Sequence, residues 1–211
     1  METIKAIILT KSAMEKHGKK GACVTAYDPV KKRFVRFVSD IQGSPIFYAF
    51  SNRFSLLDWV RVNVIRPCPL GPQTENLLVD VRSFSRIGSY EPGITEIFNA
   101  AQPPHFPRFM DDYSYKLDSA DGYDHSLELI RVTDLCIENE KGRGRASFSF
   151  VAGKRQFFRV TDPKFNIRKT NLNHWEIGSA YLVISIPTED YIKDGQAYGY
   201  FKFIAAIYPI P

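Results

Sequence analysis

The chain has 211 residues, of which 44% are hydrophobic, 24% charged and 14% aromatic. These ordinary globular values exclude a disordered or fibrous chain, and no apolar run approaches the roughly 18 residues that a membrane-spanning helix needs. The net charge of +5 is compatible with a polyanionic partner but does not require one. Because the start of the chain lacks the pattern of a secretory signal, a cytoplasmic protein without membrane contact is expected.

The first part of the chain consists of short β-like segments separated by turn residues. Aromatic and β-branched residues dominate these segments, as is typical of strands. In the segment at residues 59–65 three valines alternate with other residues. The face with the valines is expected to pack in a core, while Trp59 and Arg61 share the opposite face. The five expected strands span residues 4–10, 21–27, 33–38, 59–65 and 76–82.

A different kind of sequence follows at residues 89–125. Residues 94–101 are expected to form a short helix, which the proline-rich run 103–107 cannot continue. Residues 89–125 carry two Lys or Arg against seven Asp or Glu, whereas residues 1–88 carry 14 against seven. This acidic segment is therefore expected to bridge two domains, and its tyrosines and prolines indicate that it packs on one of them.

The last part of the chain repeats the pattern of the first. Val38-Ser39-Asp40 matches Val160-Thr161-Asp162 without a gap, and further matches at the same offset predict a structural duplication, although the identities are few. Five strands in each half, with almost no helix, predict a mainly β protein of two tandem OB-like barrels at residues 1–88 and 126–211. The strands expected in the second half span residues 127–133, 145–151, 156–161, 181–186 and 199–208.

The most particular motif of the chain is the run IRPCPLGPQTEN at residues 65–76. It resembles the signature of the dual OB-containing domain family, prokaryotic proteins with two tandem OB-like barrels. The runs ILTKS at 8–12, RFVSD at 36–40 and FKFIAAI at 201–207 resemble the same family. The resemblance implies two barrels over essentially the whole chain, and a nucleic-acid or nucleotide binder associated with bacterial defence or mobile elements, although a fold alone does not fix a function.

Basic residues stand next to aromatic residues in both halves. A barrel that binds single-stranded nucleic acid needs positive charge along the phosphates and exposed rings on which bases stack. We therefore expect a nucleic-acid site here, although the same residues are also typical of solvated turns beside core aromatics. The candidate residues are Lys32, Arg33, Arg36, Phe37, Trp59, Arg61, Arg143, Arg145, Lys154 and Arg155.

The signature run offers a second candidate site. Its polar residues Gln73, Thr74, Glu75 and Asn76 are suited to bind a ligand at the mouth of a barrel. They are equally suited to hold in place a turn that the neighbouring prolines stiffen, and the sequence does not decide between these readings.

Catalysis finds little support in the sequence. The four histidines have no metal-ligand spacing, and neither a phosphate-binding P-loop nor a nucleophile elbow occurs. The three cysteines are scattered and odd in number, which favours free thiols over disulfides or a zinc site. No catalytic residue, metal or cofactor is predicted.

The most direct hypothesis is a binding protein for single-stranded DNA, single-stranded RNA or a nucleotide, acting as an accessory component without catalysis. The alternative is a protein-interaction module for a partner effector, in which the positive charge has no role in binding. An enzyme with a site at the junction of the halves is a third and weaker hypothesis. The sequence does not indicate an oligomeric state.

Overall fold

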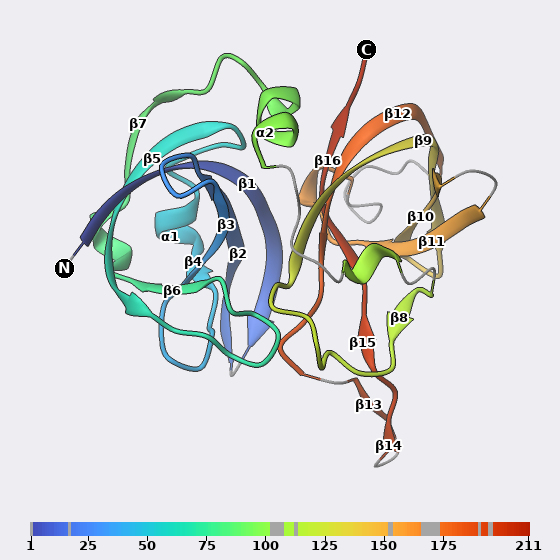
Figure 1. Ribbon diagram of the computed structural model, residues 1–211, viewed down its shortest axis with the longest axis horizontal. Coiled ribbons are helices and arrows are strands. Elements are labelled where there is room, and N and C mark those ends of the chain that lie inside the picture. Colours follow the sequence, from blue (N-terminus) through green and yellow to red (C-terminus); the bar gives the residue numbers. More distant parts are fainter. Residues whose placement is uncertain are drawn as a thin grey trace. The chain divides into compact units, whose positions relative to one another are not determined.

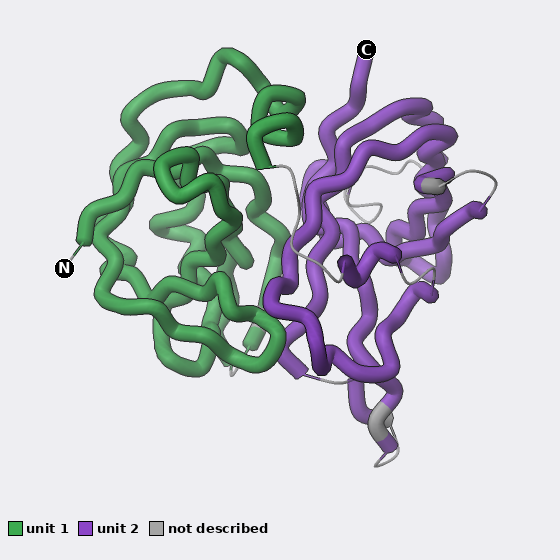
Figure 2. The backbone as a smooth tube through the Cα atoms, in the orientation of Figure 1, with its two compact units in different colours: residues 1–103 green, residues 104–211 purple. Residues whose placement is uncertain are grey.

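The computed structural model describes residues 2–16, 18–101, 108–111, 114–151, 154–165, 174–189, 191–193 and 196–211. The chain divides into two compact units, residues 1–103 and 104–211 (Figure 2). The segment expected to bridge two domains, residues 89–125, is shared between these units. The proline-rich run 103–107 lies outside the described residues.

The first unit is built around a ring of five strands: β1 (Glu2–Lys16), β2 (Lys19–Asp28), β3 (Arg33–Val38), β5 (Asp58–Pro67) and β6 (Asn76–Val79) (Figure 1). Around the ring the order is β1, β2, β3, β6, β5, and β5 pairs with β1 to close it. All neighbours are antiparallel except β3 and β6, which are parallel. Outside the ring are β4 (Ile46–Phe47), β7 (Ser85–Ser89), helices α1 (Tyr48–Ser51) and α2 (Ile94–Ala100), and the 3-10 turn η1 (Val81–Ser83).

The second unit contains a closed barrel of the same kind, made of β9 (Leu127–Glu140), β10 (Arg143–Val151), β11 (Lys154–Val160), β12 (His174–Ser185) and β16 (Phe203–Pro209). The order around it is β9, β10, β11, β16, β12, again with one parallel pair, between the third and fifth strands. The remaining elements are the 3-10 turns η2 (Phe109–Asp111) and η3 (Pro163–Phe165), β8 (Lys116–Leu117), β13 (Ile192–Lys193), β14 (Gln196–Ala197) and β15 (Tyr200–Phe201). The prediction of a mainly β chain with two OB-like barrels is confirmed.

The repeat found in the sequence has a structural counterpart. One Asp40 carboxylate oxygen accepts hydrogen bonds from the backbone N–H groups of Gln42 and Ser44, both at 3.0 Å. Asp162 accepts one from the N–H of Lys164 at 2.9 Å, so each aspartate closes a turn directly after the third strand of its barrel. Asp40 and Asp162 are 122 residues apart in the chain. The buried rings Phe37 on β3 and Phe158 on β11 are 121 residues apart, so the match between the two barrels shifts by one residue within the strands.

Each barrel has its own hydrophobic core. Val60, Val62 and Val64 are buried in the first core, while Arg61 on the same strand is exposed, as the alternation predicted. In the second core the rings of Phe148 and Phe158 meet edge to face at 5.3 Å. Because successive strand side chains point to opposite sides, burial of one face of each strand leaves the other free to carry polar groups.

Among the described residues, no helix is both long and apolar enough to cross a membrane. The three cysteines form no disulfide; Cys68 is buried, and Cys23 and Cys136 are partly buried.

A buried histidine connects the start of β9 to the segment before it. The two ring nitrogens of His125 lie 2.9 Å from Asp124 Oδ1 and 3.1 Å from Glu128 Oε1. Glu128 is itself buried, pairs with Arg108 at 3.5 Å and accepts a hydrogen bond from the N–H of Met110. Burial by itself lowers the pKa of His125, but hydrogen bonds to Glu128 and Asp124 outweigh it, so the pKa is raised.

This raised pKa predicts a stability that declines with increasing pH. The stabilisation from protonated His125 should be fully present below its unfolded pKa of about 6.5 and lost as the pH rises through the higher pKa of the folded state. Urea unfolding of the wild type and of His125→Gln should therefore show a stability difference that shrinks as the pH rises above about 6.5. His174→Gln, at a more exposed histidine of the same barrel, is the control, and a difference independent of pH contradicts the prediction.

Candidate nucleic-acid interface

A pocket of about 560 Å³ lies on the second barrel. It is lined by residues of β10 and β11, by Tyr115 and Tyr191, and by residues of β15 and the start of β16. This volume is in the range of small-molecule sites, which typically hold about 300–1,000 Å³. The pocket therefore has room for a single base or nucleotide.

The strand register explains why basic and aromatic side chains meet there. Arg145 on β10 is the direct neighbour of Arg159 on β11, which is in turn the neighbour of Phe203 on β16. On the two barrel strands these outward residues alternate with the buried Ala146 and Phe158, so both arginines face away from the core. Three adjacent strands thus place a row of two guanidinium groups and a ring on one outer face.

The turn between β9 and β10 supplies further charge. Lys141 and Gly142 both have positive φ, 52° and 78°, which is typical of a two-residue hairpin turn and favours Gly at the second position. The turn leads into Arg143, which is exposed and makes no ion pair with any residue that the structure describes. Arg145 donates a hydrogen bond from Nη1 to Glu140 Oε2 at 3.0 Å, which holds its guanidinium at the rim of the pocket.

Exposed rings complete the lining. The Phe157 side chain is 47% exposed, and the Arg145 guanidinium lies 5.9 Å from its ring centre. Elsewhere in the lining, the Phe201 ring contacts Tyr115 at 5.7 Å and Tyr191 at 5.4 Å between ring centres. Tyr115 and Tyr191 are about half exposed, at 49% and 52%. Both side chains are therefore accessible to a ligand in the pocket.

A short strand pair holds the aromatic side of the pocket together. Tyr200 and Phe201 of β15 pair with Leu117 and Lys116 of β8, and the N–H of Lys202 donates to the carbonyl of Tyr115 at 3.1 Å. Lys202 lines the pocket although it is only 1% exposed. The pocket lining contains four basic side chains and one acidic one, so its electrostatic potential favours an anion. The basic residues are Arg143, Arg145, Arg159 and Lys202, and the acidic residue is Glu140.

The structure gathers only part of the predicted site at this pocket. Arg143 and Arg145 line it, whereas Lys154 and Arg155 are exposed on β11 outside the lining. Arg155 donates from Nη2 to Ser147 Oγ at 2.9 Å. Sequence reasoning missed the residues that reach the pocket through distant pairings, namely Tyr115, Arg159, Tyr191, Phe201 and Lys202. For Arg159 the sequence offered one signal: Arg155, Phe157 and Arg159 are alternate residues of one strand and therefore share its outer face.

In the first barrel the predicted residues other than Arg36 lie in three different environments. Lys32 and Arg33 are exposed at the turn between β2 and β3, and Lys32 has a positive φ of 49°. Phe37 is a core residue, with its ring 5.4 Å from that of Phe84. Trp59 and Arg61 lie on the outer face of β5. Their role in binding nucleic acid stays a prediction.

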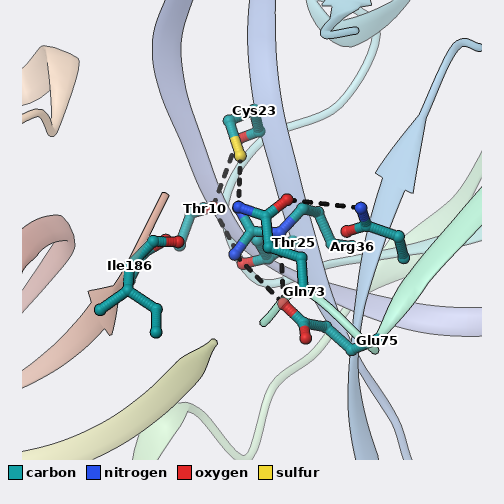
Figure 3. A network of polar contacts seen from close by, with 9 residues as sticks. Thr10, Cys23, Thr25, Arg36, Gln73, Glu75 and Ile186 are labelled. Atoms are coloured by element: carbon teal, nitrogen blue, oxygen red, sulfur yellow. Dashed lines mark hydrogen bonds and ion pairs between the residues drawn. The ribbon is translucent and has the colours of Figure 1, made fainter. Parts of the chain in front are cut away.

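Arg36 is buried in a polar network (Figure 3). Its Nε and Nη2 donate to Glu75 Oε1 at 3.3 and 3.2 Å, and Nη1 donates to Cys23 Sγ at 2.8 Å. Burial alone lowers the pKa of Arg36, but Cys23 and Glu75 outweigh that effect, so the pKa is raised above its usual value. Arg36 is therefore charged at all physiological pH values and is directed at Glu75 of the signature run.

The other residues of the signature run also bond within the first barrel. Asn76, fully buried, donates from Nδ2 to Gln73 Oε1 at 3.3 Å, and its carbonyl accepts from the N–H of Cys68. The carbonyl of Glu75 accepts from the N–H of Arg36 at 3.1 Å. Thr74 alone among the four candidate residues is exposed. These contacts give the run an architectural role, and a ligand role for it stays a prediction.

Among the described residues, no group of three or more His, Cys, Asp or Glu side chains is arranged to hold a metal ion. Two five-stranded barrels in tandem, one of them carrying a basic and aromatic pocket on its second and third strands, define a tandem OB-fold protein. The model of the dual OB-containing domain family matches residues 4–207. The chain belongs to this family, as the signature run indicated.

A search of curated proteins found no match. Among solved structures, the chain is similar to a murine DNA-binding protein bound to double-stranded DNA, with 9% identity, a TM-score of 0.37 and 100% of both chains covered. It is also similar to a protein from a study of structural mimicry for functional antagonism, with 10% identity, a TM-score of 0.37, and 96% of this chain and 88% of that chain covered. Likeness at this level gives no information on what this chain binds.

Proposed function

We propose that the protein binds single-stranded nucleic acid without catalysis, and that the pocket on the second barrel is the contact site. The observation that carries this proposal is the row formed by Arg145, Arg159 and Phe203 beside the exposed ring of Phe157. In OB-folds generally, the face of the second and third strands and the adjoining loops bind oligonucleotides. The pocket occupies that face of β10 and β11.

The lining matches the two chemical parts of a single strand. The rings of Phe157, Tyr115 and Tyr191 offer faces on which bases stack, which contributes about 1–3 kcal/mol per base. Arg143 and Arg159 supply positive charge for the phosphates between those bases. Stacking rings tolerate any base, so binding with little sequence preference is expected.

Binding is tested by fluorescence anisotropy with single-stranded DNA, single-stranded RNA and duplex DNA at several salt concentrations. With about three phosphates neutralised, the logarithm of the binding constant for a single strand should fall with the logarithm of salt concentration with a slope of about −2. Arg143→Gln should reduce that slope by about 0.7, because one phosphate contact is lost. Arg131→Gln removes an exposed arginine of the same barrel outside the pocket lining and should leave the slope unchanged.

Two results contradict the proposal. If folded protein binds no single strand at low salt, the positive charge has another role, and an interaction with a partner protein becomes the better explanation. If Arg131→Gln and Arg143→Gln weaken binding equally, the binding follows total charge and does not use the pocket.

A further inference from the structure

A second basic surface lies on the first barrel, on strands that do not form the usual ligand face. Lys5 on β1 is the direct neighbour of Arg61 on β5, and Arg61 is the neighbour of Ser85 on β7. All three side chains are exposed. We call Lys5, Arg61 and Ser85 the outer row.

Alternation along the strands fixes the direction of the outer row. The residues next to its members, Ala6 on β1 and both Val60 and Val62 on β5, are fully buried in the core of the first barrel. Lys5 and Arg61 therefore point away from that core. On one side of the row, Thr3 Oγ1 donates to Asn63 Oδ1 at 2.7 Å, which continues the polar character of the surface.

On the other side of the row stands an aromatic pair. Trp59 precedes Arg61 by two residues on β5 and therefore lies on the same outer face. Its side chain is partly exposed, and its ring meets that of Tyr90 edge to face at 5.8 Å. The contact with Tyr90 fixes the orientation of the indole next to the two positive charges.

The two positive charges of the outer row are not neutralised within the barrel. Like charges directly opposite each other on adjacent strands are destabilising. Neither Lys5 nor Arg61 forms an ion pair with any carboxylate in the part of the chain that the structure describes. The neighbouring carboxylates are used elsewhere, since Glu2 accepts from Lys31 at 2.8 Å and Asp58 accepts from Arg86 at 2.8 Å. A bound anion removes this repulsion.

We propose that the outer row, with Trp59 at its edge, is a second contact surface for single-stranded nucleic acid. Lys5 and Arg61 bind phosphates, and the Trp59 ring stacks with a base. The proposal rests on the proposed function of the pocket but assigns a separate surface on the other barrel. A strand long enough to engage both surfaces gains affinity because the second contact is intramolecular.

The test compares a short and a long probe on the full chain. Each OB-fold covers about 4–16 nucleotides, so an oligothymidylate of about 6 nucleotides fills one surface, and one of about 30 nucleotides is about as long as two such sites. The double variant Lys5→Gln/Arg61→Gln should bind the long probe roughly tenfold more weakly at low salt, with a salt slope reduced by about 1.4. Its affinity for the short probe, which the pocket holds, should stay that of the wild type.

A matched variant and a spectroscopic signal complete the experiment. Arg66→Gln/Arg82→Gln removes two exposed positive charges of the same barrel that lie outside the outer row, and it should bind both probes as the wild type does. In a Trp175→Phe background Trp59 is the one remaining tryptophan of the two in the chain. Its fluorescence should then be quenched by the long probe and not by the short one.

The outcomes separate the two proposals. If pocket variants weaken binding while Lys5→Gln/Arg61→Gln binds the long probe like the wild type, the outer row has no role and the proposed function stands. If both charge variants weaken the two probes equally, the effect is one of total charge and the outer row is again excluded. If the wild type binds neither probe, the proposed function fails, and the second surface fails with it.

Discussion

Replacing Arg36 by alanine is expected to lower the free energy of unfolding of the first barrel by about 3–5 kcal/mol. The guanidinium is buried and bonds to Glu75 and Cys23, so its removal leaves the Glu75 carboxylate in a buried site with less compensation. Removing one member of a buried ion pair is far more destabilising than replacing both members by apolar groups. Urea unfolding followed by Trp59 fluorescence in the Trp175→Phe background measures the first barrel directly.

The double variant Arg36→Met/Glu75→Leu separates charge from packing. If the loss comes from an uncompensated buried charge, the double variant should recover most of the stability that Arg36→Ala loses. If the double variant is as unstable as the single one, the loss comes from packing in the network and the electrostatic explanation is wrong. A stable Arg36→Ala that loses nucleic-acid binding would instead support a direct ligand contact for Arg36.

Arg36 shows where local sequence patterns stop being informative. It belongs to a run of basic residues with Lys32 and Arg33, and the pattern of the run predicts a charged surface. Lys32 and Arg33 are indeed exposed, but Arg36 is buried because its partner, Glu75, arrives from a segment 39 residues away. A charged side chain is buried only where a partner of opposite sign compensates it. When that partner is distant in the sequence, the residues around the charge do not predict the pairing.

The fold was more predictable than the site because it depends on regular alternation. The valines of β5 revealed the core face of that strand, and the repeated turn at Asp40 and Asp162 revealed the duplication. The aromatic side of the pocket depends instead on the two-residue strands β8 and β15, which pair across a long sequence separation. Strands this short have no alternation to detect, so Tyr115 and Phe201 gave no sign of proximity in the sequence.

The pocket and the outer row use the same physical elements on different strands. In the pocket a guanidinium lies over the exposed ring of Phe157, and in the outer row Trp59 lies two residues from Arg61 along β5. A positive charge beside an aromatic face suits a ligand that alternates anionic phosphates with flat bases. A protein partner recognised through acidic side chains alone has no need of the rings. Substitutions of the rings are therefore more informative than substitutions of the charges.

Replacing Phe157 by alanine is expected to weaken binding of single-stranded DNA by roughly 5- to 150-fold, because a stacked base contributes about 1–3 kcal/mol. Phe157 is 47% exposed and is not a member of the barrel core, so the fold of the second barrel should persist. Anisotropy titration of a fluorescent oligothymidylate measures the effect, and circular dichroism confirms folding. Phe47→Ala, at a 38% exposed phenylalanine of the first unit, is the matched control and should bind like the wild type.

Two further substitutions at the same position distinguish stacking from general hydrophobic contact. Phe157→Trp keeps an aromatic face and should retain or strengthen binding, whereas Phe157→Leu keeps apolar area without a ring and should bind nearly as weakly as Phe157→Ala. Both the Leu and the Ala variant remove the contact between Arg145 and the ring but keep the charge of Arg145. A difference in binding between these two variants therefore does not come from Arg145. Equal binding by Phe157→Leu and the wild type would show that stacking does not occur there. Binding by Phe157→Ala at wild-type strength would remove the pocket from the proposed interface.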